Sequence, residues 1–211
     1  IDKLEVLKQE IESDGGTCAV VPIDMSDRVT IREAVASVEE QLGTITTLVN
    51  NAGMPDAQWA VKQSDELIDT VMGTNLTGPY ILSCEVARKL MQEKLPGRMV
   101  NIASMAAFHT TAQSAAPLYS ITKKALVRMT ETLAVEWAGR NINVNAIAPG
   151  FFSSEMTDGM LERIGDITPT LNRKRIPTAE QMDSTLLFLL SPSSECVTGT
   201  CIKIDDGQMA R

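Results

Sequence analysis

Apolar residues at helical spacing alternate along this chain with short runs of β-branched residues, and this alternation constrains the fold most strongly. Strand-like runs lie at 18–23, 45–50, 98–103, 142–148 and 200–204, and helical patterns lie at 2–13, 27–42, 64–94, 117–138 and 178–190. This order predicts an α/β protein whose mostly parallel sheet carries helices on both faces, in three layers. No repeat, charge block or low-complexity linker divides the chain, so we expect a single doubly wound domain over residues 1–211.

The composition argues against several classes of partner. Lys and Arg number 19 against 27 Asp and Glu, and the resulting net charge of −8 repels phosphate backbones and anionic lipid surfaces. No apolar run approaches the roughly 20 residues that a membrane span needs, and no segment resembles a signal peptide. We therefore expect a cytoplasmic protein with no nucleic-acid or membrane partner.

The cysteines and the single histidine indicate no metal site. Cys18, Cys84, Cys196 and Cys201 form no C-x-x-C pair and lie mostly in apolar segments, which predicts reduced, buried, structural thiols. His109 is the only histidine, so a multi-histidine metal site cannot form. It lies in a loop, where an exposed histidine is a simpler interpretation than a contact with substrate.

Polar or small residues follow the ends of successive predicted strands. They are Asp24, residues 50–53, Ser104, the start of the helix that carries Tyr119, and residues 149–150. Ligands of open α/β sheets bind beyond the carboxyl ends of the strands, so we expect the functional site there. Within the 64–94 helical pattern, Gly73, Gly78 and Pro79 predict a bend or break.

Tyr119 and Lys123 are four positions apart, which places them one turn apart on the same face of a helix. Ionising an ordinary tyrosine at neutral pH costs about 4 kcal/mol. A cation about 4 Å away offsets about that much at an effective dielectric constant near 20. The spacing therefore favours an acidic phenol, although a lone Y-x-x-x-K is more simply an amphipathic helix whose lysine faces water.

Other motifs occur in order around this pair. They are N-N-A-G at 50–53, T-N-L-T-G with Asn75, V-N-I-A-S ending at Ser104, N-A-I-A-P-G at 145–150, and I-D-D-G at 204–207. Together they span essentially the whole chain and resemble the short-chain dehydrogenase/reductase family. The resemblance implies a Rossmann-like fold and an NAD(P)-dependent oxidoreductase acting on a secondary alcohol or ketone. Within the family, the chain is similar to the group whose members reduce 3-oxoacyl thioesters or oxidise sugar acids and polyols.

The resemblance implies a role for four catalytic residues. Tyr119 would exchange a proton with the substrate oxygen as hydride moves to or from a nicotinamide. Lys123 would lower the pKa of Tyr119 and hold the nicotinamide ribose, and Ser104 would donate a hydrogen bond to the substrate oxygen. Asn75 would support a water that links Lys123 to solvent. Taken alone, Ser104 is more simply a strand-end cap and Asn75 a helix-breaking polar residue.

The resemblance also implies contacts with NAD or NADP. Asp24 and Met25 would meet the adenine, and the N-N-A-G backbone would approach the adenosine ribose. The implied contact residues are Asp24, Met25, Asn51, Ala52, Gly53, Tyr119, Lys123, Pro149, Gly150, Phe152 and Ser154. Without the family, Asp24 is equally an N-cap of the 27–42 helix, and both N-N-A-G and Pro149-Gly150 are ordinary turns.

The chain departs from the family pattern at its amino end. The phosphate-cradling T-G-x-x-x-G-x-G loop does not occur before Asp24. In the family's strand order, 18–23 would be the third strand, and the two strands between it and 45–50 would be missing. We therefore expect an incomplete sequence that lacks the first strand-helix-strand unit, which leaves an unpaired edge and a gap in the sheet. Smaller departures are Ala103 in place of serine and Asp206 in place of glycine.

Further expectations concern substrate, assembly and an alternative function. Residues 151–176 are expected to form a lid over a small carbonyl or alcohol substrate. The helices at 76–94 and 117–138 resemble those that pair between subunits in the family, which implies a homotetramer or homodimer. The alternative is a non-catalytic regulatory or scaffold protein that has lost cofactor binding.

Overall fold

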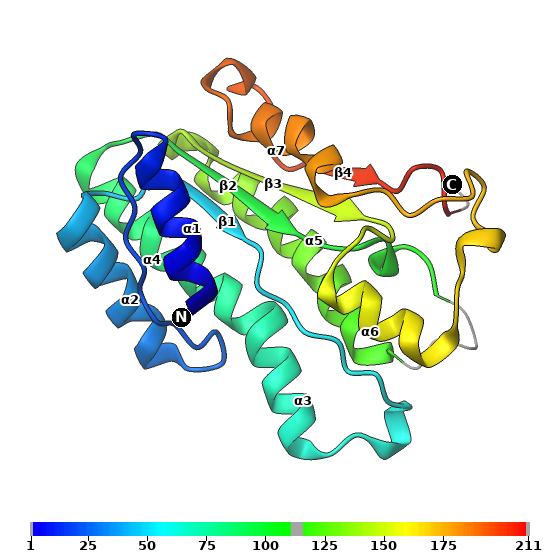
Figure 1. Cartoon of the computed structure of the whole chain (residues 1–211). Coiled ribbons are helices and arrows are strands. Elements are labelled where there is room, and N and C mark those ends of the chain that lie inside the picture. The colour runs from blue at the N-terminus through cyan, green and yellow to red at the C-terminus, as the bar shows by residue number, and fades with distance from the viewer. Residues whose placement is uncertain (1, 111–115, 210–211) are drawn as a thin grey trace.

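Four parallel strands form the centre of the computed structural model, which describes residues 2–110 and 116–209 (Figure 1). The strands are β1 (Thr47–Asn50), β2 (Gly97–Ile102), β3 (Ile142–Pro149) and β4 (Cys201–Ile204), and they lie side by side in sequence order. A helical crossover joins each strand to the next one along the chain, as parallel pairing requires. The predicted α/β class, the mostly parallel sheet and the four strands from residue 45 onward are confirmed.

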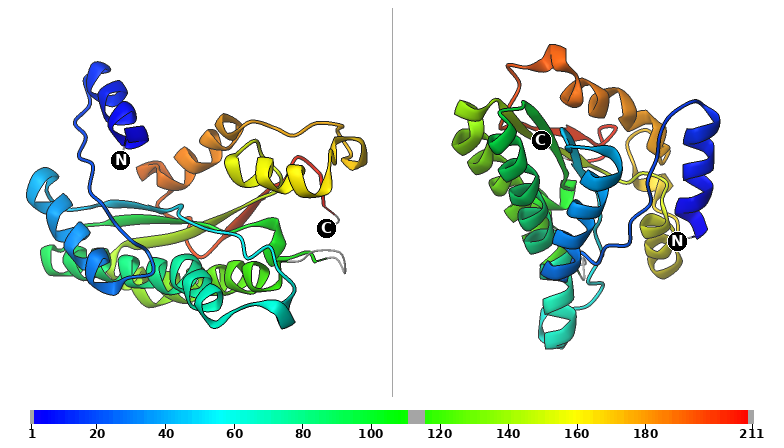
Figure 2. Two further views of the ribbon diagram at one scale, coloured as in Figure 1. Left: turned by 60° about the horizontal axis from the view of Figure 1, so that its bottom comes forward. Right: turned by 90° about the vertical axis from the view of Figure 1, so that its left-hand side faces the viewer.

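Helices cover both faces of the sheet, as Figure 2 shows. The α-helices are α1 (Asp2–Ser13), α2 (Arg28–Leu42), α3 (Asp65–Met72), α4 (Gly78–Glu93), α5 (Pro117–Trp137), α6 (Glu155–Ile164) and α7 (Asp183–Leu190). Short 3-10 turns occupy Ala60–Lys62, Met105–Ala107, Ala138–Arg140, Thr168–Thr170, Ala179–Met182 and Pro192–Ser194. The predicted 178–190 helix therefore begins as a 3-10 turn and continues as α7.

Two apolar clusters fix these layers. On one face, Leu90 of α4 and Leu126 of α5 pack against Met99 and Val144 of the sheet. On the other face, Leu189 of α7 packs against Val100 and Ile147. Burial on both faces explains why most side chains of the central strands β2 and β3 are apolar.

A polar network lies within this core. Asn50 and Asn101 are paired in register on β1 and β2, and the Asn50 amide donates to the Asn101 side-chain oxygen at 2.7 Å. The Asn50 amide also donates to Ser83 at 3.0 Å, and Asn101 donates to Thr130 at 2.8 Å. These four side chains are nearly inaccessible to solvent. The network therefore joins β1 and β2 to α4 and α5 by directional bonds inside the apolar layer.

The helical path from 65 to 93 is not broken at its glycines. Residues Gly73–Thr77 form a π-helical turn between α3 and α4. A Cβ atom on Gly73 would lie 2.9 Å from the Ser26 Cβ, and one on Gly78 would lie 2.2 Å from the Met25 carbonyl oxygen. The two glycines therefore let the chain around Met25 lie directly against this turn, and the predicted interruption takes the form of a wider turn.

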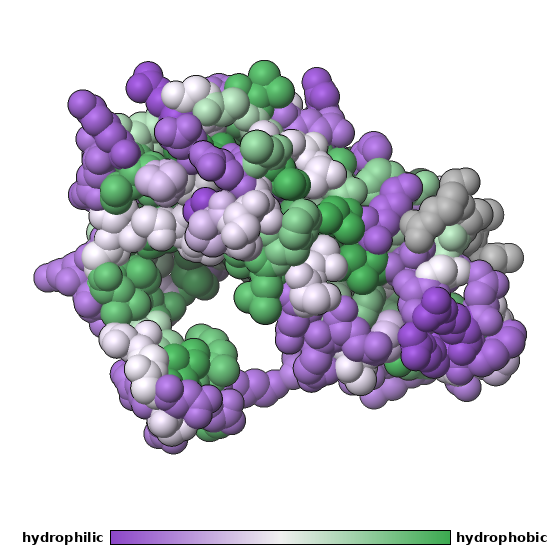
Figure 3. Space-filling model, turned by 90° about the horizontal axis from the view of Figure 1, so that it is seen from above, coloured by the Kyte–Doolittle hydropathy of each residue, from purple (hydrophilic) through white to green (hydrophobic). Residues whose placement is uncertain are grey.

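The predicted strand at 18–23 is wrong. Residues 16–24 run without regular secondary structure, because β1 is the edge strand of the described sheet and offers no ladder near them. Helix α1, correctly predicted, lies apart from the sheet, and an opening separates the two (Figures 2 and 3). Its Leu4 and Leu7 side chains are exposed, although their spacing is that of a buried face. An ion pair between Lys3 and Glu155 joins α1 to α6.

Two further predictions need correction. The N-cap of α2 is Asp27, whose carboxylate accepts the Val29 backbone N–H at 2.7 Å, and not Asp24. The four cysteines are free thiols, but Cys196 is exposed and the other three are only partly buried. Among the described residues, no helix is both long enough and apolar enough to cross a bilayer.

We predict that Gly78→Ala lowers the free energy of unfolding by about 1–3 kcal/mol, because the new methyl group would overlap the Met25 carbonyl. Urea denaturation monitored by circular dichroism measures the change. Gly139→Ala is the matched control, since nothing lies within 4 Å of its Cβ position. Equal stability of the two variants would contradict the close approach.

Candidate active site

The catalytic residues expected from the sequence converge at the carboxyl ends of β1 and β2. Ser104 follows β2, Tyr119 and Lys123 occupy the first two turns of α5, and Asn75 lies in the π-helical turn before α4. The glycine of N-N-A-G, Gly53, lies beside them after β1. Elements far apart in the sequence therefore supply one cluster of polar groups, at the edge of the sheet where ligands bind in this fold class.

The side chain of Ser104 lies close enough to Tyr119 to influence the ionisation of its phenol. Burial raises the pKa of Tyr119 above its ordinary value, and the interaction with Ser104 opposes this shift. Ser104 also caps the 3-10 turn after β2, since its hydroxyl accepts the Ala106 N–H at 3.1 Å. Ser104 therefore caps the turn after the strand and also lies beside Tyr119.

Lys123 does not face water. Its side chain is buried, and its ammonium donates to the Ile102 carbonyl oxygen at 2.7 Å. The Nζ atom lies 5.6 Å from the centroid of the Tyr119 ring. Burial lowers the pKa of Lys123 to about 8.

The prediction that Lys123 makes Tyr119 acidic is not met in this structure. The ammonium lies over the Tyr119 ring and is bound to the end of β2, and burial determines the direction of the phenol's pKa shift. The resting phenol is therefore protonated at neutral pH.

Asn75 holds the loop that follows β1. Its side-chain oxygen accepts the Met54 N–H, and its amide donates to the Met54 carbonyl oxygen, both at 2.9 Å. The same amide donates to the Thr122 hydroxyl at 3.2 Å, which ties the loop to α5 between Tyr119 and Lys123. Asn75 is fully buried, and the π-helical turn aims its side chain at the loop.

Gly53 lies close to the buried lysine, so that a side chain at this position would crowd the Lys123 ammonium. A Cβ atom there would lie 3.2 Å from the Lys123 Nζ and 3.6 Å from the Asn75 side-chain oxygen. Asn51 and Ala52 precede it and are exposed. The N-N-A-G segment is therefore exposed at Asn51 and Ala52 and lies close to Lys123 and Asn75 at Gly53.

Met25 and Ser26 lie against the turn that carries Asn75, through the close contacts of Gly78 and Gly73, and Asp24 directly precedes them. Asp24 is exposed, and its carboxylate accepts both the backbone N–H and the hydroxyl of Ser26. These bonds lower the pKa of Asp24. The structure therefore brings the predicted adenine contacts to the same side of the sheet as Asn75, without a direct bond to the cluster.

The residues after β3 form a separate group. Gly150 abuts the C-terminal loop, because a Cβ there would lie 2.3 Å from the Gln208 side-chain oxygen. Phe152 is buried, whereas Ser154 is exposed and caps α6 by accepting the Thr157 N–H at 3.2 Å. Among the described residues, no hydrogen bond or ion pair joins this group to Tyr119 or Lys123.

The expected lid region, residues 151–176, contains α6 and is tied to the C-terminal loop. Asp206 receives two hydrogen bonds from Arg175, at 2.8 and 3.0 Å, and an ion pair from Arg173 at 3.0 Å. Asp206 has φ 50°, the left-handed conformation that glycine adopts without cost. Arg173 and Arg175 therefore join residues 151–176 to Asp206, the position at which the resemblance to the family implies a glycine.

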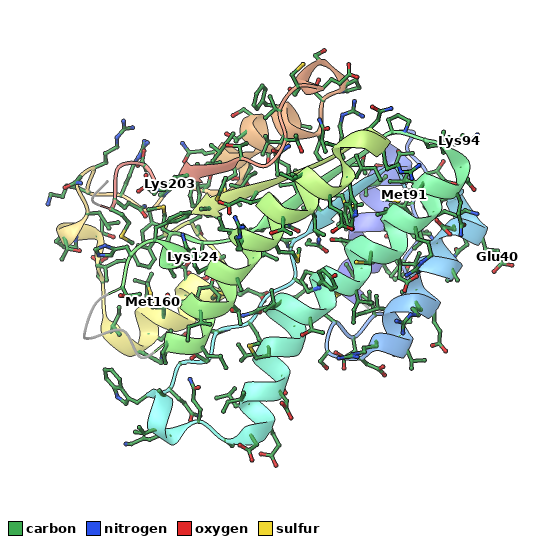
Figure 4. All side chains as sticks on the ribbon, turned by 180° about the vertical axis from the view of Figure 1, so that it is seen from behind. Glu40, Met91, Lys94, Lys124, Met160 and Lys203 are labelled. Carbon is green, nitrogen blue, oxygen red and sulfur yellow. The ribbon has the colours of Figure 1, made fainter. Side chains whose placement is uncertain are left out.

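Aromatic and cationic side chains lie at the same end of the molecule. Lys124 and Lys203 approach the Phe108 ring to 4.5 and 4.4 Å from its centroid. Figure 4 shows both lysines at the end where Met160 of α6 lies. His109 is exposed in the loop beside Phe108, as expected, and the rest of that loop, residues 111–115, lies outside the described residues.

Sequence reasoning missed Asp56, Met54 and Thr122. Asp56 is 2% exposed, and its carboxylate accepts the Leu118 N–H at 2.9 Å, immediately before Tyr119. No local pattern reveals this contact, because the two residues are 62 positions apart. The only sequence signal is the position of Asp56 three residues after N-N-A-G, in the loop that leads away from β1.

Comparison with known proteins identifies the family. A family profile described as enoyl-(acyl carrier protein) reductase matches residues 2–209. The 2-dehydro-3-deoxy-D-gluconate 5-dehydrogenase of Dickeya dadantii is 34% identical over 191 residues, covering 89% of this chain and 75% of that protein. The 3-oxoacyl-(acyl-carrier-protein) reductase of Thermotoga maritima is 32% identical over 207 residues, covering 98% and 83%.

Solved structures of the same family are similar to this chain over most of its length. A short-chain dehydrogenase/reductase from Mycobacterium marinum superposes with a TM-score of 0.93 at 27% identity, covering 100% of this chain and 83% of that one. A polyketide ketoreductase of actinorhodin synthesis with NADPH gives 0.91 at 27% identity, covering 98% and 84%. A 4-hydroxyisoleucine dehydrogenase with NADH gives 0.79 at 29% identity, covering 91% and 81%.

The chain therefore belongs to the short-chain dehydrogenase/reductase family, and as a member it is an NAD(P)-dependent oxidoreductase. Within the family it is of the type represented by the 3-oxoacyl-(acyl-carrier-protein) reductases and the sugar-acid dehydrogenases.

We predict that Lys123→Met stabilises the fold at pH 7 by up to about 3 kcal/mol. The folded-state pKa, about 8, lies below the ordinary value of 10.5, so below pH 8 the folded protein bears the full cost of a buried charge. That cost falls as the pH rises from 8 to 10.5, and the advantage of the variant should shrink over this window. Urea denaturation between pH 7 and 10.5 measures it, and a constant difference would refute the assignment.

Proposed function

We propose that this protein transfers a hydride between a nicotinamide cofactor and a small secondary alcohol or ketone, with Asn75, Ser104, Tyr119 and Lys123 as its catalytic residues. The observation that carries the proposal is the proximity of Ser104 to Tyr119, with the buried Lys123 ammonium over the ring of the same tyrosine. As isolated residues they have ordinary structural explanations, but together they form a proton-transfer site.

Tyr119 acts as the acid in the reductive direction. Its phenol is protonated at neutral pH, since burial raises its pKa, and it gives that proton to the substrate oxygen as negative charge develops there. The Ser104 hydroxyl donates a hydrogen bond to the same oxygen. When bound, the nicotinamide cofactor supplies the hydride, and it accepts one in the oxidative direction.

Lys123 and Asn75 support the phenol after it has given up its proton. A buried ammonium close to the ring stabilises the phenolate, and this interaction grows in strength where water is excluded. Asn75 anchors Met54 and Thr122 around the lysine and, we propose, orients a water that links Lys123 to solvent. Proton return to Tyr119 would follow this route.

The residues present fit a nicotinamide cofactor at its ribose end. The close packing of Gly53 against Lys123 leaves a cradle that any larger side chain would fill, and the lysine has donor capacity beyond its bond to Ile102. We assign the nicotinamide ribose to Tyr119 and Lys123. The exposed Asn51 and Ala52, followed by Gly53, are assigned to the adenosine ribose.

We assign the adenine to Asp24 and Met25, and the nicotinamide amide to four residues after β3: Pro149, Gly150, Phe152 and Ser154. Asp24 is exposed, so its carboxylate is accessible to an adenine amino group. NAD and NADP are both found with related structures, and either is compatible with these residues.

The substrate class follows from the relatives. A 3-oxoacyl thioester or a sugar acid or polyol fits the proposal, since reductases and dehydrogenases of these compounds are similar in sequence over most of this chain. We propose that residues 151–176 cover the substrate, anchored by the contacts of Arg173 and Arg175 with Asp206. The same relatives favour an enzyme over a scaffold without cofactor.

We also propose a homotetramer or homodimer in the cytoplasm. Exposed apolar residues lie along α4 and α5, namely Tyr80, Ile121 and Val135, and Val135 is 81% exposed. A second copy that packs on these helices would remove this surface from water. Free thiols at all four cysteines fit a reducing compartment.

We predict that Tyr119→Phe lowers kcat at least about a hundredfold, because the ring stays in place but the transferable proton is lost. NAD(P)H absorbance with a panel of 3-oxoacyl thioesters and keto sugar acids measures turnover. Tyr80→Phe is the control, since the chain has two tyrosines and Tyr80 lies on the exposed face of α4. Near-normal turnover in Tyr119→Phe would disprove the mechanism.

We predict that Val135→Arg shifts the assembly toward the monomer, because a charge would replace apolar surface at the proposed interface. Size-exclusion chromatography with light scattering gives the mass. Val61→Arg, at a residue 94% exposed on the Ala60–Lys62 turn, should leave the assembly unchanged. A monomeric wild-type protein would contradict the proposed oligomer.

A further inference from the structure

Asp56 is a buried carboxylate that takes no part in the proton transfer proposed above. It is 2% exposed, in the loop between β1 and α3. One carboxylate oxygen accepts the Leu118 N–H at 2.9 Å and the Gln63 side-chain amide at 2.5 Å. Among the described residues, the other oxygen is buried without a hydrogen-bond partner. Such a group costs stability compared with a well-packed apolar side chain, so its presence requires an explanation in position or function.

The start of α5 depends on this carboxylate. Ala116, at the N-cap position, supplies no side-chain hydrogen bond, and Pro117 has no N–H to cap. The Leu118 N–H is therefore the first backbone donor of the helix, and Asp56 accepts it from a loop 62 residues away. A helix N-terminus also favours a negative charge through its partial positive potential. The next residue along the helix is Tyr119.

The loop that carries Asp56 is fixed at its other end by Asn75. Both backbone groups of Met54 bond to the Asn75 side chain, and Asp56 follows two residues later. Asn75 also bonds to Thr122 of α5. The loop is thus held between the π-helical turn and the first two turns of α5, and it leaves α5 little freedom to slide along β2.

We propose that Asp56 is a positioning residue, which by capping α5 from the β1 loop sets the distance between the Tyr119 hydroxyl and Ser104. This inference rests on the proposed function, in which that distance determines proton transfer. Ser104 caps the turn after β2, and Ser120 of α5 donates to the Ala106 carbonyl oxygen of that turn at 2.6 Å. Asp56 adds a contact at the first backbone donor of α5, next to Tyr119, and so limits how the first turn of the helix lies relative to Ser104. A misplacement of about 1 Å is enough to slow a reaction substantially.

The test compares Asp56→Ala with Asp27→Ala in the full-length protein. Asp27 is a matched control, since its carboxylate also caps the second backbone N–H of a helix, in α2. We expect Asp56→Ala to lower kcat at least tenfold while KM for the cofactor stays within twofold, and Asp27→Ala to leave both unchanged. Asp56→Asn keeps a capping oxygen and should restore kcat to within threefold of wild type.

A second readout does not depend on turnover. In a Tyr80→Phe background Tyr119 is the sole tyrosine, so carbon-13 labelling of tyrosine gives one ring signal in NMR spectra. Asp56→Ala should shift or broaden this signal, whereas Asp27→Ala should not. If Asp56→Ala does not fold, Asp56→Ser, which retains a hydroxyl acceptor, takes its place and should give an intermediate kcat and a shifted signal.

Unchanged kcat and an unchanged Tyr119 signal in Asp56→Ala, or in Asp56→Ser where that is measured, would overturn the inference. Failure of Asp56→Asn to restore kcat would overturn it too. A wild-type protein inactive on every substrate of the panel would count against the proposed function alone, since the NMR comparison still tests the position of Tyr119.

Discussion

The burial of the Lys123 ammonium is the constraint around which the site is arranged. A buried cation without a carboxylate partner is costly, and among the described residues the Lys123 ammonium donates only to the Ile102 carbonyl oxygen at the end of β2. The lysine lies where the strand stops, and α5 must pass close to that point. Gly53 and Asn75 fit closely around the same group. The fold thus accepts a locally unfavourable charge in order to hold a cation over the Tyr119 ring.

The sequence predicted most of the sheet and helices because their signals are local. Apolar periodicity and glycine or proline stops located α5 and β3 to within a residue or so at each end. The 18–23 strand failed because a strand exists only through its neighbours, and this segment has no ladder in the described structure. The π-helical turn was not predicted either. In the sequence, Gly73 and Gly78 indicate a break in the helix as readily as a close approach by another segment, here the chain at Met25.

The site residues that lie in short sequence motifs could be predicted. The residues that reach the site only through tertiary contacts could not. Ser104, Tyr119 and Lys123 lie in short patterns, and the structure brings them together. The direction of the phenol's pKa shift was predicted wrongly, because spacing along a helix says nothing of burial, and burial dominates. Asp56 was missed because its contact with Leu118 joins two segments with no pattern in common.

The paired asparagines beneath the site have a consequence for strand alignment. Asn50 and Asn101 can bond to each other only when β1 and β2 are in their observed register. A slip by one residue would separate the two amides within an apolar layer and leave hydrogen bonds unmade. Gly53 comes three residues after Asn50, and Ser104 three residues after Asn101. The bond between the two buried amides therefore fixes the register of β1 and β2. The loops that carry Gly53 and Ser104 consequently begin at the same height along the sheet.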